Sequence, residues 1–243
     1  MIQTIEELAM NAWPALQTIL YDGWVIRFAN GYTRRANSII PVYSEQLAAQ
    51  DKLAECEHLY QVRGLPVIFK LNGEQEARAL DDLLAARGYQ AEASTWVQTM
   101  ALDGQNFTID PRIVLEAEPG EAWQAGFARL SGLAAARKDT HHQMLLAILP
   151  AKCFAALVVN GEVRACGLAV LQAGWVGFFD IVVDAGCRRQ GLGEAIMRSL
   201  LGWAQQNGAR NAYLQVMKNN PPALSLYAKL GFRPAYSYWY RVK

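Results

Sequence analysis

The clearest pattern of apolar and polar positions lies in the second half of the chain. Three apolar runs of strand length follow one another, separated by Asn-Gly and Ala-Gly turns: Cys153–Val159, Arg164–Gln172 and Trp175–Val183. Apolar runs joined by tight turns of this kind are typical of an antiparallel meander. The sequence therefore predicts three neighbouring strands at the centre of this half.

Helices and further strands flank this meander. Before it we expect a strand over Arg112–Ala117, a helix that opens at Pro119 and Glu121, and a helix over about Asp139–Leu149, capped by Asp139 or Thr140. After it we expect a helix from Leu192 to Asn207, a strand over Ala212–Met217, a helix from Pro221 or Pro222 to Gly231, and a strand over Arg233–Val242. The predicted order is β-α-α-β-β-β-α-β-α-β, an α/β fold.

The first half has a less regular pattern. Its expected elements are paired strands over Gly23–Ala29 and Arg34–Ile40, a helix over Ser44–Tyr60, a strand over Pro66–Leu71, a helix over Glu74–Arg87 and a strand over Ala93–Leu102. A polar segment rich in turn formers, residues 103–111, separates this block from the next. We therefore expect two domains, residues 1–103 and residues 111–243.

An internal echo relates the two blocks. Leu83–Gln98 aligns without gaps on Leu226–Arg241, with five identities in sixteen positions. Any unit made of a helix, a glycine, an aromatic residue and a strand would show some of this similarity. The shared tryptophan eight residues after the glycine, Trp96 and Trp239, favours a diverged duplication instead.

Composition narrows the classes of partner. The chain has 243 residues, of which 52% are hydrophobic and 19% charged, with a net charge of +1. This balance provides no general attraction to nucleic acid or to an anionic membrane. The start lacks the features of a signal peptide, and Pro150 and Lys152 interrupt the most apolar stretch. We therefore expect a soluble, cytoplasmic protein without nucleic-acid or membrane partners.

Cysteine and histidine usage argues against a metal site. The four cysteines form no C-x-x-C pair and only three histidines are present, so neither a disulfide scaffold nor structural zinc is expected. His141 and His142 are adjacent, so on a helix they point in different directions. Both are interpreted as solvated helix residues.

The strongest chemical signal follows the last strand of the meander. Val183 leads into a short loop with the pattern Arg188-x-x-Gly191-x-Gly193, after which a helix begins. Glycines let the backbone approach a ligand closely, and the free N–H groups of a helix start attract phosphate oxygens. The loop matches neither a P-loop nor a dinucleotide fingerprint. From the residues alone, the site is either a cradle for a phosphate-bearing ligand or a glycine-rich turn.

Two motifs together resemble a known superfamily. Arg188-x-x-Gly191-x-Gly193 is similar to the [QR]-x-x-G-x-[GA] pyrophosphate loop of the GNAT (GCN5-related N-acetyltransferase) superfamily. Downstream, Asn220-x-x-Ala223-x-x-Leu226-Tyr227-x-x-x-Gly231-Phe232 resembles the second motif of that superfamily. The resemblance implies an acyl-CoA N-acyltransferase fold with a mixed sheet. It also implies acetyl-CoA as cofactor and direct acetyl transfer to an amine of a small molecule or peptide.

The resemblance also assigns roles by position. The pantetheine arm would lie against the backbone of Ile181, Val182 and Val183, and an N–H near Val182 would polarise the thioester. The pyrophosphate would be held by Arg188, Arg189, Gln190, Gly191, Leu192, Gly193 and Glu194. Asn220 would contact the cofactor, and Tyr227 would protonate the leaving thiolate. Cys187 is interpreted as a bystander, because direct transfer needs no acyl-enzyme.

The general base is assigned to Asp180, which lies in the otherwise apolar run Phe178–Val183. A buried carboxylate is costly unless it is paired or used. Strand alternation predicts that Phe179 and Ile181 face away from it. Asp180 is a candidate base or amine anchor, while a structural hydrogen bond or proton loss through water are the alternatives.

The first block departs from the superfamily pattern. Leu84 stands where Tyr227 stands in the second block, and Arg34–Pro41 provides no phosphate cradle. We therefore expect a degenerate copy that supports the catalytic half or walls its substrate cleft. A non-catalytic acetyl-CoA sensor and transfer of a different acyl group, such as succinyl, remain alternatives. The sequence does not identify the acceptor or the oligomeric state.

Overall fold

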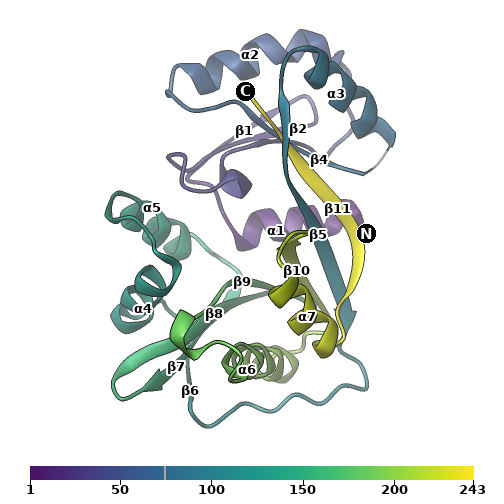
Figure 1. The fold of residues 1–243 in the computed structure, drawn as a ribbon. Helices are drawn as coiled ribbons and strands as arrows, with labels where there is room; N and C mark the ends of the chain where they lie inside the picture. Colours follow the sequence, from purple (N-terminus) through teal and green to yellow (C-terminus); the bar gives the residue numbers. More distant parts are fainter. Residues whose placement is uncertain (74) are drawn as a thin grey trace.

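One mixed sheet of 11 strands runs through the computed structural model, which describes residues 1–73 and 75–243 (Figure 1). The first half contains α1 (Ile2–Ala12), β1 (Gln17–Tyr21), β2 (Trp24–Phe28), η1 (Arg34–Ala36), β3 (Ile39–Pro41), α2 (Ala49–Gln61), β4 (Ile68–Asn72), α3 (Gln75–Ala86) and β5 (Gln90–Ala101). The second half contains β6 (Ile113–Glu116), α4 (Glu121–Ser131), α5 (Ala135–Leu146), β7 (Ala151–Val159), β8 (Glu162–Gln172), β9 (Trp175–Val183), η2 (Ala185–Cys187), α6 (Leu192–Gln206), β10 (Asn211–Met217), α7 (Pro221–Leu230) and β11 (Arg233–Val242).

The strand order reveals an exchange between the halves. It runs β1-β2-β3-β4-β11-β5-β10-β9-β8-β7-β6, so β11 lies beside β4 of the first half and β5 lies beside β10 of the second. Both β3–β4 and β9–β10 are parallel pairs, and both β4–β11 and β10–β5 are antiparallel. The two halves are thus related across the β5–β11 pair, and each half gives its last strand to the other. Figure 1 shows these two long strands crossing from one lobe to the other.

The similarity between Leu83–Gln98 and Leu226–Arg241 concerns the exchanged strands, since these segments lead into β5 and β11. Trp96 on β5 packs against the core beneath α6 and α7, whereas Trp239 on β11 packs against the core beneath α2 and α3. The indole N–H of Trp239 donates to Asp81 on α3 at 2.7 Å. Equivalent tryptophans therefore pack in opposite halves, as expected for a duplicated unit that has exchanged strands.

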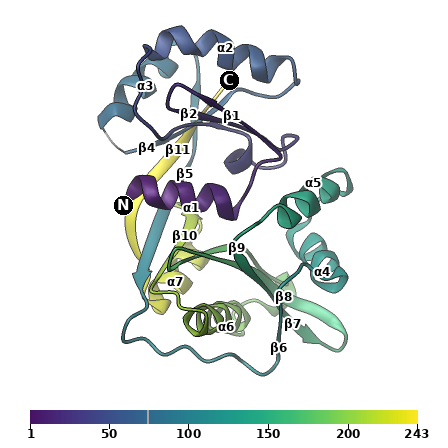
Figure 2. The same cartoon turned by 180° about the vertical axis from the view of Figure 1, so that it is seen from behind.

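Helix α1 lies across the junction of the halves, in front of β5 and β11 in Figure 2. Its buried Glu6 forms an ion pair with buried Lys70 of β4 at 2.5 Å, and the Tyr236 hydroxyl of β11 donates to Glu6 at 2.7 Å. Burial and the Glu6 carboxylate raise the pKa of Tyr236, which keeps the phenol protonated as a donor. These contacts fix α1 to both halves of the sheet.

Two expectations for the first half are wrong in part. Arg34–Ala36 forms a 3-10 turn instead of a strand, because the buried side chain of Asn37 bonds to the backbone of the preceding loop. The helix expected from Ser44 begins only at Ala49, because the carboxylate of Asp22 accepts the N–H groups of Gln46 and Leu47. The structure also contains α1 and β1, which the sequence interpretation did not assign. The start expected for the next helix, Glu74, lies outside the described residues.

The predicted element order of the second half is confirmed, and β9 and β11 have the predicted bounds. Helix α5 differs from the prediction in its start. It begins at Ala135, earlier than expected, and its N-cap is Ala134 rather than Asp139 or Thr140. This shift places Thr140 inside the helix, where its hydroxyl accepts from Asn30 of the first half at 3.2 Å. The division into domains at residues 103 and 111 stays a prediction, although the intervening segment packs on α6 through Phe107 and a bond from the Asp110 N–H to Ser199.

Candidate functional site

Strands β9 and β10 part halfway along their length. They pair in parallel from Trp175 opposite Asn211 to Phe178 opposite Leu214. Beyond these positions β9 continues beside β8 as far as Val183, and β10 continues beside β5 as far as Met217. The opening between them borders Ile181, Val182 and Val183, the residues predicted to line the pantetheine arm. Backbone groups that no neighbouring strand pairs are available to a ligand there.

A β-bulge lies at the point where β9 leaves β10. Phe179 pairs with Leu168 and Val182 pairs with Cys166, so Asp180 and Ile181 share one position opposite Gly167. Asp180 has a φ of 51°, which is consistent with a bulged residue. A Cβ on Gly167 would lie 2.5 Å from the Cδ1 atom of Ile181, so a larger residue there would force the Ile181 side chain to shift.

The bulge changes which side chains share a face. Ile181 packs toward α6, away from Asp180, as predicted. Phe179 belongs to the core under α1, α4 and α5, on the same face as the Asp180 carboxylate, so the prediction for Phe179 is wrong. Regular alternation fails because two consecutive residues of the bulge fill one pleat.

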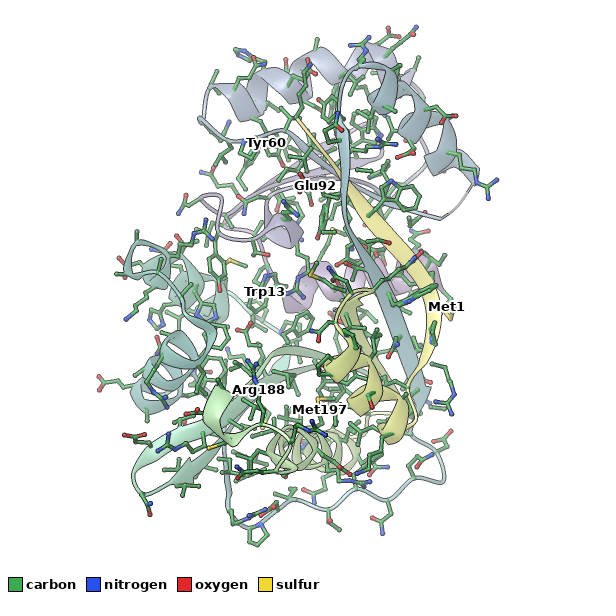
Figure 3. The ribbon with its side chains drawn as sticks, in the orientation of Figure 1. Met1, Trp13, Tyr60, Glu92, Arg188 and Met197 are labelled. Carbon is green, nitrogen blue, oxygen red and sulfur yellow. The ribbon has the colours of Figure 1, made fainter. Side chains whose placement is uncertain are left out.

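The loop after β9 is anchored at its start and exposed at its end. Asp184 accepts from the Gly186 N–H at 2.9 Å and from Arg164 at 2.9 Å, and these bonds hold the pKa of its carboxyl below the usual value. Arg188, Arg189 and Gln190 are exposed. Figure 3 shows Arg188 on this loop, beside the start of α6. The loop therefore presents two cations next to a helix N-terminus.

The first turn of α6 is open to a ligand. Gly191 is its N-cap, with a φ of 80° that favours glycine, and no described side chain caps the helix. The N–H groups of Leu192, Gly193 and Glu194 precede the first helical bond, from Ala195 to Gly191. A hollow of about 430 Å³ lies beside this turn. The arrangement suits phosphate oxygens.

Glu194 can serve such a ligand only through its backbone. Its carboxylate pairs with Lys229 of α7 at 2.5 Å and with Arg198 at 3.1 Å. The hydrogen bond from Lys229 lowers the pKa of the Glu194 carboxyl, so the side chain stays anionic. The pair joins α6 to α7, and the Glu194 N–H remains in the first turn.

The second motif builds the start and the end of α7. The Asn220 side chain accepts from the Ala223 N–H at 3.3 Å and caps the helix, Pro221 occupies its first turn, and Gly231 ends it with a φ of 105°. The cap explains the asparagine locally, so its contact with a cofactor stays a prediction.

Tyr227 lies on the inner face of α7. Its ring is 9% exposed and packs edge-on against Phe232, with 6.1 Å between ring centroids. Burial raises the pKa of Tyr227 to about 12, and the charge of Arg35 acts in the opposite direction. The phenol therefore keeps its proton near neutral pH, which is the state that a general acid needs.

Asp180 is paired with His141, a residue that the sequence interpretation placed in solvent. The two side chains are 8% and 4% exposed, and the His141 Nε2 atom lies 2.8 Å from the carboxylate. The imidazole stacks on Phe127 with ring centroids 4.5 Å apart. The prediction for His141 is wrong, because its side of α5 also carries Met144 and Leu145, which are buried against the sheet.

Aromatic rings of the first half form a wall on the other side of the Asp180–His141 pair. Trp13 stacks on Phe179 at 5.7 Å and lies 6.0 Å from the His141 ring, while the Tyr32 ring lies 5.5 Å from His141. Burial and the Asp180 carboxylate raise the pKa of Tyr32. Figure 3 shows Trp13 near the centre of the molecule, between the two lobes. Sequence spacing within the second half gave no signal for these residues.

Buried polar groups hold that wall in place. Arg27 is 3% exposed and donates to the backbone oxygens of Arg35 and Trp13, each at 2.6 Å, and to Met10 at 3.1 Å. Burial lowers the pKa of Arg27 to about 10. Asn37 bonds to both ends of the loop that carries Tyr32. The two residues fix the end of α1 and the loop 29–37 relative to each other.

The rest of the described chain bears on three further points: metal binding, membrane crossing and the reactivity of thiols. No three His, Cys, Asp or Glu side chains in residues 1–73 and 75–243 are grouped to hold a metal ion. In the same residues, no helix combines the length and apolar character needed to cross a membrane. Burial raises the pKa of the Cys56 and Cys153 thiols to about 12 and also raises that of Cys166, so these three are poor nucleophiles.

Comparisons with known proteins cover the full length of the chain. The family described as "Probable histone acetyltransferase Rv0428c C-terminal" matches residues 1–241. An uncharacterized N-acetyltransferase, YobR of Bacillus subtilis, is 33% identical over 100% of this chain and 98% of its own length. The probable histone acetyltransferase Rv0428c of Mycobacterium tuberculosis is 26% identical over 96% of this chain and 70% of its own.

Solved structures share the fold. A GCN5-related N-acetyltransferase from Kribbella flavida superposes with a TM-score of 0.71 and 12% identity, over 99% of this chain and 95% of that one. A tandem GNAT protein from the clavulanic acid biosynthesis pathway superposes with a TM-score of 0.65 and 11% identity, over 98% and 87%. At this identity the likeness concerns the fold alone, and it extends over both halves.

Proposed function

The chain belongs to the GNAT N-acetyltransferases, in the family described as Probable histone acetyltransferase Rv0428c C-terminal, and from this premise we propose that it transfers an acetyl group from acetyl-CoA directly to an amine. The observation that carries the proposal is the parting of β9 and β10 beside the uncapped first turn of α6. An extended arm fits the opening, and its phosphates fit the helix N-terminus.

The residues present fit the proposed donor. The N–H groups of Leu192, Gly193 and Glu194 would hold pyrophosphate oxygens, with Arg188 and Arg189 adding positive charge. When bound, acetyl-CoA supplies the thioester carbonyl to be attacked. The backbone beside the bulge would polarise the carbonyl oxygen.

Asp180 and His141 would receive the acceptor amine. The carboxylate attracts an ammonium group, and the Asp180–His141 pair or water takes the proton that the amine must lose before it attacks. A bond forms between the amine nitrogen and the acetyl carbon as the carbon–sulfur bond breaks. Tyr227 then gives its proton to the departing sulfur and regains one from solvent.

A direct test follows thiol release. The protein is incubated with acetyl-CoA and a panel of primary amines, and acetyl-CoA binding is measured separately by calorimetry. We expect binding together with amine-dependent thiol release, and the same turnover in a Cys187→Ser variant, since direct transfer uses no thiol. Binding without turnover of any amine would favour a sensor instead of an enzyme.

We expect Asp180→Asn to lower kcat/KM for the acceptor by about tenfold. General bases contribute roughly a hundredfold or more, and water as a second proton acceptor reduces the loss. Asparagine tolerates the φ of 51° at this position and keeps the shape of the side chain, so the bulge should survive. The measurement is steady-state kinetics at saturating acetyl-CoA.

The control is Asp139→Asn, which removes a charge from an exposed position on α5, the helix that carries His141. Its kcat/KM should stay at the wild-type value. An Asp180→Asn enzyme with full kcat/KM would leave the carboxylate with a structural role only.

A further inference from the structure

In the part of the chain that the structure describes, the N–H groups of the Arg35 side chain have neither a hydrogen-bond acceptor nor an ion-pair partner. Its guanidinium carbon lies 5.5 Å from the Trp13 ring centroid and 5.9 Å from that of Phe179. Within the described part of the chain, no carboxylate pairs with the group and no oxygen accepts its hydrogen bonds. Contacts with these two rings hold the guanidinium in place, and they leave its N–H groups available to a ligand.

Two neighbouring arginines of the first half are occupied. Arg34, in the same turn, pairs with Glu92, and Arg27 donates to three backbone oxygens. A guanidinium matches a carboxylate through two parallel hydrogen bonds, and removing it from water without such a partner is costly. Arg35 is half-buried, so it is placed to receive an anion that the described chain does not supply.

The guanidinium lies beside the acceptor end of the proposed reaction centre, because Trp13, one of the two rings that it contacts, also lies against His141, the partner of Asp180. Its positive charge also acts on Tyr227 and Tyr32, where it partly offsets the rise in pKa that burial causes. The Asp180 carboxylate acts on Tyr32 in the opposite direction and raises its pKa. Arg35 and Asp180 thus provide opposite charges on one cluster of rings, formed by Trp13, Phe179 and His141. Arg137 also acts on Tyr32, from an exposed position on α5.

The position of Arg35 is built into the fold. Its backbone oxygen accepts from buried Arg27 at 2.6 Å, and the turn that carries it ends at Asn37, which bonds to the preceding loop. A donor group on a fixed loop loses little freedom when it binds a ligand. This is the arrangement expected of a recognition residue.

We propose that Arg35 binds a carboxylate of the acceptor, so that the substrate is a small acid carrying a primary amine near its carboxylate, as in an amino acid. Asp180 attracts the ammonium group and Arg35 the carboxylate, which orients the nitrogen toward the thioester. A polyamine would place a second cation against Arg35 and be disfavoured. The inference rests on the proposed function, because it names the acceptor of that same site.

The test compares acids with their amides. Glycine, alanine, glutamate and phenylalanine are assayed with acetyl-CoA beside their carboxamides, with spermidine and tryptamine as amines that lack a carboxylate. In the wild-type enzyme the acids should have the higher kcat/KM. In Arg35→Met the ratio of acid to amide should fall by about tenfold, as expected for loss of a charge-assisted pair. Comparing this ratio between the variant and the wild type cancels the difference in amine pKa between acid and amide.

Matched variants and a second donor separate the outcomes. Arg34→Met should keep the wild-type ratio, and Arg35→Lys should keep part of it. Turnover of spermidine or tryptamine without turnover of the acids, or an equal loss for acid and amide in Arg35→Met, would overturn the inference and leave the proposed function standing. Preference for succinyl-CoA that Arg35→Met abolishes would also overturn it, by assigning Arg35 to the acyl group. No turnover of any amine would be the distinct failure of the proposed function itself.

Discussion

Tyr227→Phe is expected to lower kcat by about a hundredfold, the lower end of the range for a lost general acid, with little change in the free energy of unfolding. The ring is buried and contacts Phe232, and phenylalanine keeps that packing. The loss would therefore come from the missing proton donor. Initial rates of thiol release at saturating amine and acetyl-CoA measure the effect.

The pH profile sharpens this prediction. Burial raises the pKa of Tyr227 to about 12, so its acid form is fully present at neutral pH and is lost only as the pH rises through that value. Titration of Tyr227 should therefore cause no fall in kcat between pH 6 and pH 10, because even pH 10 lies about two pH units below the pKa of Tyr227. Tyr227→Phe should lower the whole profile without changing its shape in that range.

A second tyrosine provides the control. Tyr89 is also buried, but it lies in the core of the first half and donates to Glu57 at 2.9 Å. Tyr89→Phe removes a hydrogen bond and should cost about 1 kcal/mol of stability with kcat unchanged. If Tyr227→Phe kept wild-type kcat across this pH range, Tyr227 would have no role as the acid.

The local geometry of the proposed donor site could be predicted from the sequence. Gly191 and Gly193 at a helix start, and Asn220 followed by Pro221, are short-range signals with a direct physical meaning. The second half also has strong periodicity, since its turns and apolar runs are regular. The parting of β9 and β10 follows from their neighbours, which spacing along the chain does not reveal.

The proposed acceptor side was less predictable from the sequence because it depends on long-range contacts. His141 shares a helical spacing with buried Met144, Leu145 and Ile148, a signal that was present in the sequence. The partner of His141 is nevertheless set by a bulge at Asp180 that regular strand alternation does not include. Arg35 lies in a segment expected to be a strand, and the side chain of Asn37, by bonding to the preceding loop, helps to hold this segment in a turn.

The strand exchange connects the first half to the chemistry of the second. Residues Thr95–Ala101 of β5 pair along β10, including the part of β10 that has left β9. That pairing satisfies β10 on its other edge and keeps it away from β9 where the pantetheine arm is proposed to lie. We therefore propose that the first half helps to hold the proposed donor site open without a cofactor motif of its own, in addition to supplying Trp13, Tyr32 and Arg35.

The same exchange predicts that the two halves do not come apart when the chain is cut. Asp103, Gly104, Gln105 and Asn106 are exposed between β5 and the buried Phe107, a suitable place for an inserted protease site. After cleavage we expect the fragments to migrate as one 1:1 complex in size-exclusion chromatography and to keep the circular dichroism of the intact protein. Each fragment isolated in urea and refolded alone should aggregate, and refolding the mixture should restore the complex.

The reason is the number of strand edges that separation would expose. In the first fragment β5 would lose β10 and β11, and β4 would lose β11, while in the second β10 would lose β5. Long unpaired edges with apolar side chains such as Trp96 favour aggregation. Uncleaved protein with the same insertion is the control. Because β11 is the counterpart of β5, one result would contradict the prediction: a second fragment that folds alone, with β11 moved into the place of β5 beside β10.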